Sequence, residues 1–120
     1  MNFKKESSDN YTVVNSEVEK LDSSNSAELK SEFVLLNKNS VNSIILNLQH
    51  TKYCDSSGLS AILIGNRLCK DSGGTFALTG LQPNVAKMIQ ISQLDKVLNI
   101  YETVKEASSK AMTSEGSQQA

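Results

Sequence analysis

The residue types best suited to chemistry lie together in one short segment, Asp55-Ser56-Ser57-Gly58. The segment directly precedes the most apolar stretch of the chain, residues 59–69, in which apolar side chains recur at helical spacing. We therefore predict that it lies at a helix start, where several backbone N–H groups lack partners and partial positive charge accumulates. Asp and Ser side chains can accept hydrogen bonds from those N–H groups. One interpretation is thus simple helix capping, with Gly58 easing the turn.

A second interpretation is a regulatory phosphosite at Ser56. A phosphoryl group would add about −1.5 to −2 charges and three strong acceptors at neutral pH. A helix start can hold such an anion without unfolding, and Asp55 would make the modified site more negative still. Repulsion from a partner carboxylate about 6 Å away would be roughly 1 to 5 kcal/mol. That range corresponds to about tenfold to a few thousandfold in affinity, which is ample for a switch.

Other catalytic or metal-binding machinery is missing from the sequence. Cys54 and Cys69 form no CxxC pair, so we expect two buried, reduced thiols. His50 is the single histidine, and we expect it to be an exposed loop residue after a strand. Gly73-Gly74 lacks the lysine and the spacing of a phosphate-binding loop and predicts a turn. We therefore expect no enzyme activity, no metal site and no cofactor.

Composition excludes further classes of protein. Twelve Lys and Arg against thirteen Asp and Glu give a net charge of −1, and Arg67 is the single arginine, so we expect no nucleic-acid partner. The longest apolar run, residues 61–64, is far shorter than a membrane span, and no apolar segment follows the basic start at residues 1–6. We expect a cytoplasmic protein. Lys52, Arg67 and Lys70 are interpreted as solvated surface, with contact to an acidic partner as the alternative.

Periodicity predicts strands that alternate with helices, which is typical of an α/β domain. The expected strands are residues 11–14, 18–21, 43–48, 75–79 and 96–101, with a further strand before Asp55, and the expected helices are 24–36, 59–69, one that starts at Pro83, and 103–111. We expect a flexible N-terminus at residues 1–10, one domain at 11–111 and a disordered tail at 112–120.

Three segments resemble the STAS domain of bacterial anti-sigma factor antagonists. They are Ile44-Ile45-Leu46-Asn47-Leu48, Tyr53-Cys54-Asp55-Ser56-Ser57-Gly58-Leu59 and Gly73-Gly74, and the likeness covers residues 10–108. Asp55-Ser56-Ser57-Gly58-Leu59 matches the family's Asp-Ser-(Ser/Thr)-Gly-Leu signature, and Leu21-Asp22 resembles its Leu-Asp before the first helix. The resemblance implies an α/β fold with a mixed sheet of four or five strands and helices packed against it.

The resemblance also implies a mechanism called partner switching. The unmodified antagonist binds an anti-sigma factor that is itself a serine kinase, phosphorylation of the antagonist releases it, and a cognate phosphatase resets the cycle. By position, Ser56 is the phosphoacceptor, and Asp55, Ser57 and Gly58 serve partner or kinase recognition. Asp55 would orient the hydroxyl or the kinase, while Ser57 would cap the helix. ATP and magnesium would belong to the kinase.

Two positions depart from the family pattern, because Glu19 and Ser60 stand where the family often has glycine. The turn at Glu19 borders the usual partner surface, and Ser60 makes the helix start bulkier, so both leave the partner's identity open. An alternative reading is a STAS domain that is never phosphorylated and serves as a subunit of a transporter or of a larger signalling assembly.

Overall fold

The computed structural model describes residues 2–112. In chain order its elements are β1 (Phe3–Ser7), β2 (Thr12–Ser16), β3 (Lys20–Leu21), α1 (Ser26–Lys38), β4 (Ile44–Asn47), β5 (Tyr53–Cys54), α2 (Ser56–Asp71), β6 (Phe76–Thr79), α3 (Pro83–Ile91), the 3-10 helix η1 (Leu94–Lys96), β7 (Asn99–Tyr101) and α4 (Val104–Lys110). The tail expected at 112–120 lies outside the described residues apart from Met112. That residue is buried, which differs from the expected disorder.

A mixed sheet of five strands forms the centre of the fold, in the order β1-β2-β4-β6-β7. β1 pairs with β2 antiparallel, and the other neighbouring pairs are parallel. β4 and β6 are buried along their whole length because helices cover them on both faces, as their continuous apolar sequences predict. The α/β class and the mixed sheet expected from the sequence are confirmed.

A second, separate sheet has only two short strands. β3 pairs with β5 in parallel, with Lys20 opposite Tyr53 and Leu21 opposite Cys54. This small sheet lies at the end of the molecule where the parallel strands of the main sheet finish and where α2 begins. It therefore joins the segment before α1 to the segment before α2.

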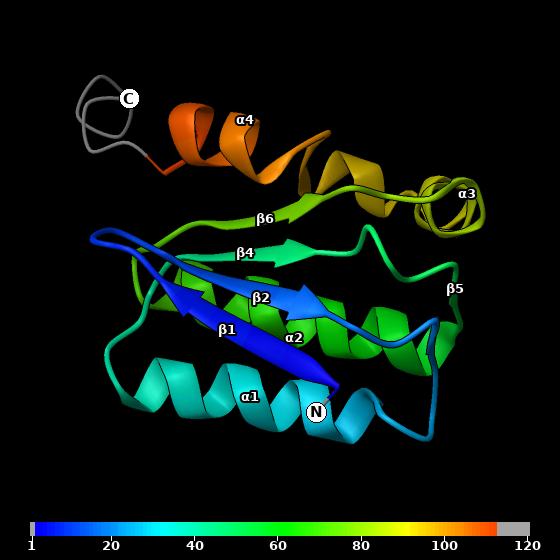
Figure 1. Ribbon diagram of the computed structural model, residues 1–120, viewed down its shortest axis with the longest axis horizontal. Helices are drawn as coiled ribbons and strands as arrows, with labels where there is room; N and C mark the ends of the chain where they lie inside the picture. Colours follow the sequence, from blue (N-terminus) through cyan, green and yellow to red (C-terminus); the bar gives the residue numbers. More distant parts are fainter. Residues whose placement is uncertain (1, 113–120) are drawn as a thin grey trace.

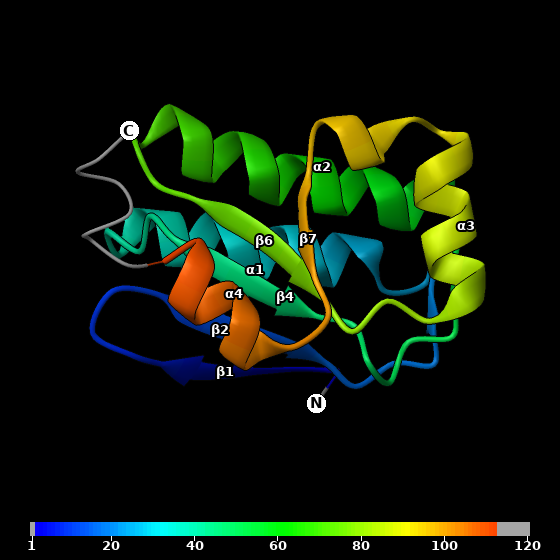
Figure 2. The same cartoon turned by 90° about the horizontal axis from the view of Figure 1, so that it is seen from above.

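Helices cover the two faces of the main sheet unequally. α1 and α2 pack side by side on one face, α4 lies on the other, and α3 stands beyond the end of the strands (Figures 1 and 2). The larger core lies under α1 and α2, where the rings of Phe33 and Phe76 meet edge to face at 5.6 Å between centroids. Gly65 of α2 fits against both rings, because a Cβ there would come within 2.8 Å of each.

The N-terminal segment differs from the expected flexible start, because Phe3–Ser7 form β1. Four of its five residues are exposed, so the sequence carries little strand signal. The strand exists because five residues pair with β2 and because Phe3 is 1% exposed in the larger core. A strand of this kind depends on a partner distant in sequence, which local periodicity does not detect.

Other boundaries shift by a few residues. α1 begins two residues later than expected, and α2 begins at Ser56, three residues earlier. Residues Leu94–Lys96 form a 3-10 turn in place of the start of the last strand. Gly73 has φ +78°, so the predicted turn residue is confirmed. No helix within residues 2–112 combines the length and the apolar character needed to cross a bilayer.

Candidate functional site

The candidate site is the junction of β5 and α2. Asp55 is the N-cap residue, with extended backbone, and its carboxylate accepts a hydrogen bond of 3.0 Å from the backbone N–H of Gly58. Ser56 is the first residue of α2 and is exposed, while Ser57 is half-buried. The capping side chain is thus Asp55, one of the residue types expected to cap the helix, whereas the family resemblance implied Ser57. The arrangement presents the Ser56 side chain to solvent at the positive end of a 16-residue helix.

The polypeptide before Ser56 is held by the strand and turn that precede α1. The carbonyl oxygen of Glu19 accepts hydrogen bonds from the N–H groups of Lys52 and Tyr53, at 2.8 and 3.1 Å. The carbonyl oxygen of Leu21 accepts one from the N–H of Asp55, at 3.2 Å. The two segments that match the family motifs, one at Leu21 and one at Asp55, therefore lie side by side.

Gly58 has a packing role that its motif position alone does not reveal. It is buried, and a Cβ at this position would lie 2.6 Å from Cys54 Sγ and 2.6 Å from the carbonyl oxygen of Leu21. Only glycine allows α2 to approach the small sheet this closely. The recognition roles expected for Asp55, Ser57 and Gly58 stay predictions, and the capping by Asp55 and the close approach at Gly58 are structural roles beside them.

Asp22 ends the neighbouring motif segment and shapes the turn into α1. Its carboxylate accepts hydrogen bonds from the hydroxyl of Ser24 at 2.6 Å and from the backbone N–H of Ser24 at 3.0 Å. These bonds, the hydroxyl bond foremost, lower the pKa of Asp22 below its ordinary value. The carboxylate is therefore engaged in the turn.

The cysteines and the histidine stand as the sequence predicts. Both thiols are free and buried, and burial raises the pKa of Cys54 to about 12 and that of Cys69 to about 11. Protonated thiols of this kind are poor nucleophiles. His50 is exposed after β4. Within residues 2–112, no three His, Cys, Asp or Glu side chains are grouped as a metal ion would require.

Three exposed apolar side chains that the sequence did not reveal lie in β5, at the end of α3 and after η1. Tyr53 is 47% exposed, Ile91 at the end of α3 is 68% exposed, and Val97 is 49% exposed. A surface hollow of about 380 Å³ on α2 is lined by Ser60, Leu63, Ile64, Asn66, Arg67 and Val97. For Ile91 the available signal was an apolar residue on a helix, and periodicity alone does not separate its outer side from the core.

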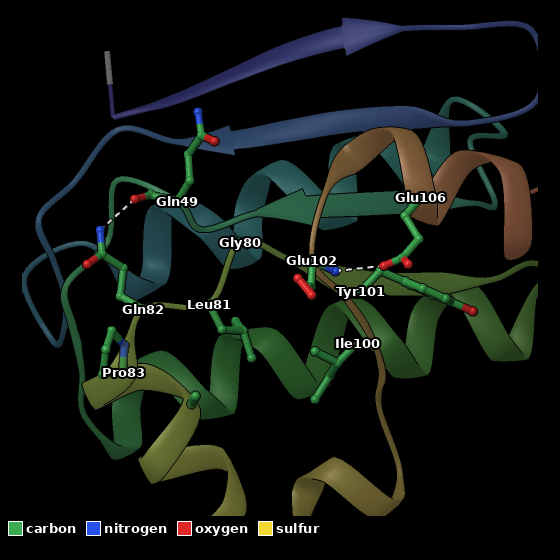
Figure 3. A pocket seen from close by; sticks show the side chains of 10 residues that line it. Gln49, Gly80, Leu81, Gln82, Pro83, Ile100, Tyr101, Glu102 and Glu106 are labelled. Atoms are coloured by element: carbon green, nitrogen blue, oxygen red, sulfur yellow. Dashed lines mark hydrogen bonds between the residues drawn. The ribbon is translucent and has the colours of Figure 1, made fainter.

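A larger hollow of about 620 Å³ lies where β4, β6 and β7 end (Figure 3). Its lining combines apolar Leu81 and Ile100 with polar Gln49, Gln82 and Glu102, and Gln82 Nε2 donates to the Gln49 carbonyl oxygen at 2.6 Å. The carboxylate of Glu106 accepts the N–H of Glu102 at 2.9 Å. The side chains of Gln82 and Glu106 thus bond to backbone groups of the lining itself. The hollow therefore indicates no single class of ligand.

Comparison with known proteins gives matches along most of the chain. The model of the family described as STAS domain matches residues 2–107. An anti-sigma F factor antagonist from Paenibacillus polymyxa is 36% identical over 59 residues, which make up 49% of this chain and 50% of that protein. The match thus spans about half the length of this curated relative.

Solved structures extend the likeness to the whole fold. The crystal structure of a Thermotoga maritima protein assigned as an anti-sigma factor antagonist has a TM-score of 0.82 at 27% identity, covering 92% of this chain and 95% of that one. SpoIIAA in its unphosphorylated form has a TM-score of 0.75 at 24% identity, covering 88% and 91%. The phosphorylated form of SpoIIAA from Bacillus has a TM-score of 0.70 at 23% identity, covering 89% of this chain and 96% of that one. The SpoIIAA matches show a shared fold.

Proposed function

Because this chain belongs to the STAS domain family, we propose that it is an anti-sigma factor antagonist that works by partner switching at Ser56. The unmodified chain binds an anti-sigma factor that is also a serine kinase and thereby releases a sigma factor. Transfer of a phosphoryl group from ATP to the Ser56 hydroxyl then expels the antagonist, and a cognate phosphatase restores it. ATP and magnesium bind to the kinase, and the cycle runs in the cytoplasm without a nucleic-acid contact by this chain.

The observation that carries the proposal is the exposed Ser56 at the first position of α2. A phosphoryl group there stands at a helix N-terminus, where free N–H groups and the helix dipole favour an anion. The segment is anchored from its inner side by bonds to Glu19 and Leu21, so the added charge leaves the scaffold in place. The likeness in fold to SpoIIAA, whose structures include a phosphorylated form, gives independent support.

The proposal also gives the surrounding residues roles in partner binding. Asp55 keeps Ser56 at the helix start by capping α2, and the free edge of its carboxylate adds to the negative charge after phosphorylation. Tyr53, Ile91 and Val97 supply exposed apolar surface near this end of the molecule for the unmodified complex. A partner carboxylate about 6 Å from the phosphate would weaken that complex by roughly 1 to 5 kcal/mol.

The test is phosphorylation by the anti-sigma factor kinase encoded in the same genome, with ATP and magnesium, read by intact-mass spectrometry. We expect one phosphoryl group on the wild type, one on the matched control Ser60→Ala, and none on Ser56→Ala. Purified phosphorylated chain should bind the kinase at least about tenfold more weakly than unmodified chain. A wild-type chain that stays unmodified, or a Ser56→Ala variant that is still phosphorylated, contradicts the proposal. Tight binding without modification favours a STAS subunit of a larger assembly.

A further inference from the structure

Thr51 lies in the loop between the main sheet and the small sheet. It follows β4 and precedes β5, and it is 0% exposed. Its hydroxyl donates to the carbonyl oxygen of Val18 at 2.7 Å, and its Oγ1 lies 2.7 Å from the Oγ of Ser16, which is also 0% exposed. Two hydroxyl groups and one carbonyl oxygen thus form a buried chain.

The direction of this chain follows from proton counting. A threonine hydroxyl carries one hydrogen, and that of Thr51 is directed to the Val18 carbonyl. Ser16 must therefore be the donor in the bond between the two hydroxyl groups. Because the groups are shielded from water, loss of one member leaves its neighbours with unpaired polar atoms, which is more costly than at the surface.

This chain of hydrogen bonds connects the two sheets. Ser16 ends β2 of the main sheet, and Val18 lies two residues before β3 of the small sheet. The backbone N–H of Thr51 also bonds to the carbonyl of Leu48, at 3.0 Å, so Thr51 is fixed to the end of β4 as well. Thr51 therefore ties the polypeptide on both sides of the small sheet to the main sheet.

We propose that Thr51 is a positioning residue for the phosphoacceptor Ser56, an inference that rests on the function proposed above. After Thr51, backbone hydrogen bonds join the polypeptide to the segment that contains β3. The N–H groups of Lys52 and Tyr53 donate to the carbonyl oxygen of Glu19, and the N–H of Asp55 donates to that of Leu21. The Thr51 hydroxyl bonds the first carbonyl of that same segment. It thus sets the starting position from which the five following residues lead to the Ser56 hydroxyl.

The kinetic consequence is specific. Thr51 is buried and cannot touch the kinase, so its loss leaves the phosphoryl-transfer step itself unchanged. Loss of the hydroxyl instead lowers the fraction of molecules in which the small sheet is held correctly against the main sheet. The apparent affinity of the kinase for the chain falls in proportion to this docked fraction. A hydrogen bond of ordinary net strength shifts the docking equilibrium roughly fivefold. KM for the chain as substrate should therefore rise by the ratio of the docked fractions of wild type and variant, which is at most about fivefold, with kcat unchanged.

The experiment compares Thr51→Val, which has no hydroxyl, with Thr51→Ser, which keeps it. Thr79→Val is the matched control, because Thr79 is also 0% exposed and its hydroxyl also bonds a side chain, that of Asn47 in the main sheet. Amide hydrogen exchange is measured for Tyr53 and Asp55 relative to the amides of β4. KM and kcat for Ser56 phosphorylation are measured with the same anti-sigma factor kinase.

We expect Thr51→Val to speed exchange at Tyr53 and Asp55 roughly fivefold relative to β4. KM should rise by the ratio of docked fractions that the exchange protection of wild type and variant gives. Thr51→Ser should restore both values, and Thr79→Val should change neither. Unchanged relative exchange in Thr51→Val, or a KM that does not follow the docked fraction measured by exchange, overturns the inference. A wild-type chain that is never phosphorylated counts against the proposed function alone, because the exchange measurement still decides whether Thr51 holds the segment.

Discussion

Replacement of Gly58 by alanine tests the close contact between α2 and the small sheet. The added methyl group would stand 2.6 Å from Cys54 Sγ and 2.6 Å from the carbonyl oxygen of Leu21. Ordinary carbon contacts are about 3.5 to 4 Å. The thiol can rotate away, but the Leu21 oxygen belongs to the backbone and accepts the Asp55 N–H. The methyl group is accommodated only if α2 and the small sheet separate.

The expected cost follows from two opposing effects. Overpacking of a buried site costs about 1 to 3 kcal/mol. Alanine gains up to about 1 kcal/mol over glycine in helix propensity, and less within the first turn. We expect the free energy of unfolding to fall by about 1 to 2 kcal/mol. For a chain of this size that corresponds to a decrease in Tm of roughly 3 to 8 °C.

Urea denaturation followed by circular dichroism measures this change, with Ser60→Ala on the exposed side of the same helix as the control. Ser60→Ala should leave stability within about 0.5 kcal/mol of the wild type. In a Cys54→Ala background the cost of Gly58→Ala should shrink but persist, because the Leu21 oxygen remains. If Gly58→Ala is as stable as the wild type or more so, the tight approach of α2 to the small sheet is refuted.

Three further outcomes follow from the structure. Asp55→Ala should lower the free energy of unfolding by about 1 kcal/mol in thermal melts through loss of the N-cap, whereas Asp55→Asn should lose much less. Phe3→Ala should cost about 3 to 5 kcal/mol in urea titrations, and a smaller effect would contradict the burial of β1. Because the pKa of Cys54 is raised from 9.0 to about 12 and that of Cys69 to about 11, the unfolded chain loses these protons first. The thiols should therefore leave stability unchanged below pH 9 and reduce it as the pH rises towards 12, and native protein should resist iodoacetamide until urea is added.

Local sequence was sufficient to predict the elements whose burial follows directly from their own pattern of apolar residues. β4 and β6 are covered on both faces, so their continuous apolar runs predicted them within a residue or two. Pro83 predicted the start of α3 because its missing N–H costs nothing there. β1 could not be predicted in this way, since its polar residues become a strand only by pairing with β2.

At the site, the sequence located the helix start but not the contacts that shape it. An Asp-Ser pair before an apolar run predicted a helix start, and α2 does begin at Ser56, which is exposed. Whether Asp55 or Ser57 caps the helix depends on which residue has extended backbone, and the tetrapeptide alone does not decide that. Thr51 sits in a polar stretch that looks like any loop, and only the packing of two sheets buries it.

The unequal covering of the main sheet decides where the molecule opens first on warming. α1 and α2 rest on the larger core, whereas α4 is held by a small cluster made of Val13, Ile45, Ala77, Ala107 and Met112. Segments with little apolar burial detach at low free energy while the rest of the protein stays native. α4 should therefore fray before α2 moves. A molecule that has lost this outer helix should still hold Ser56 in its native place at the start of α2.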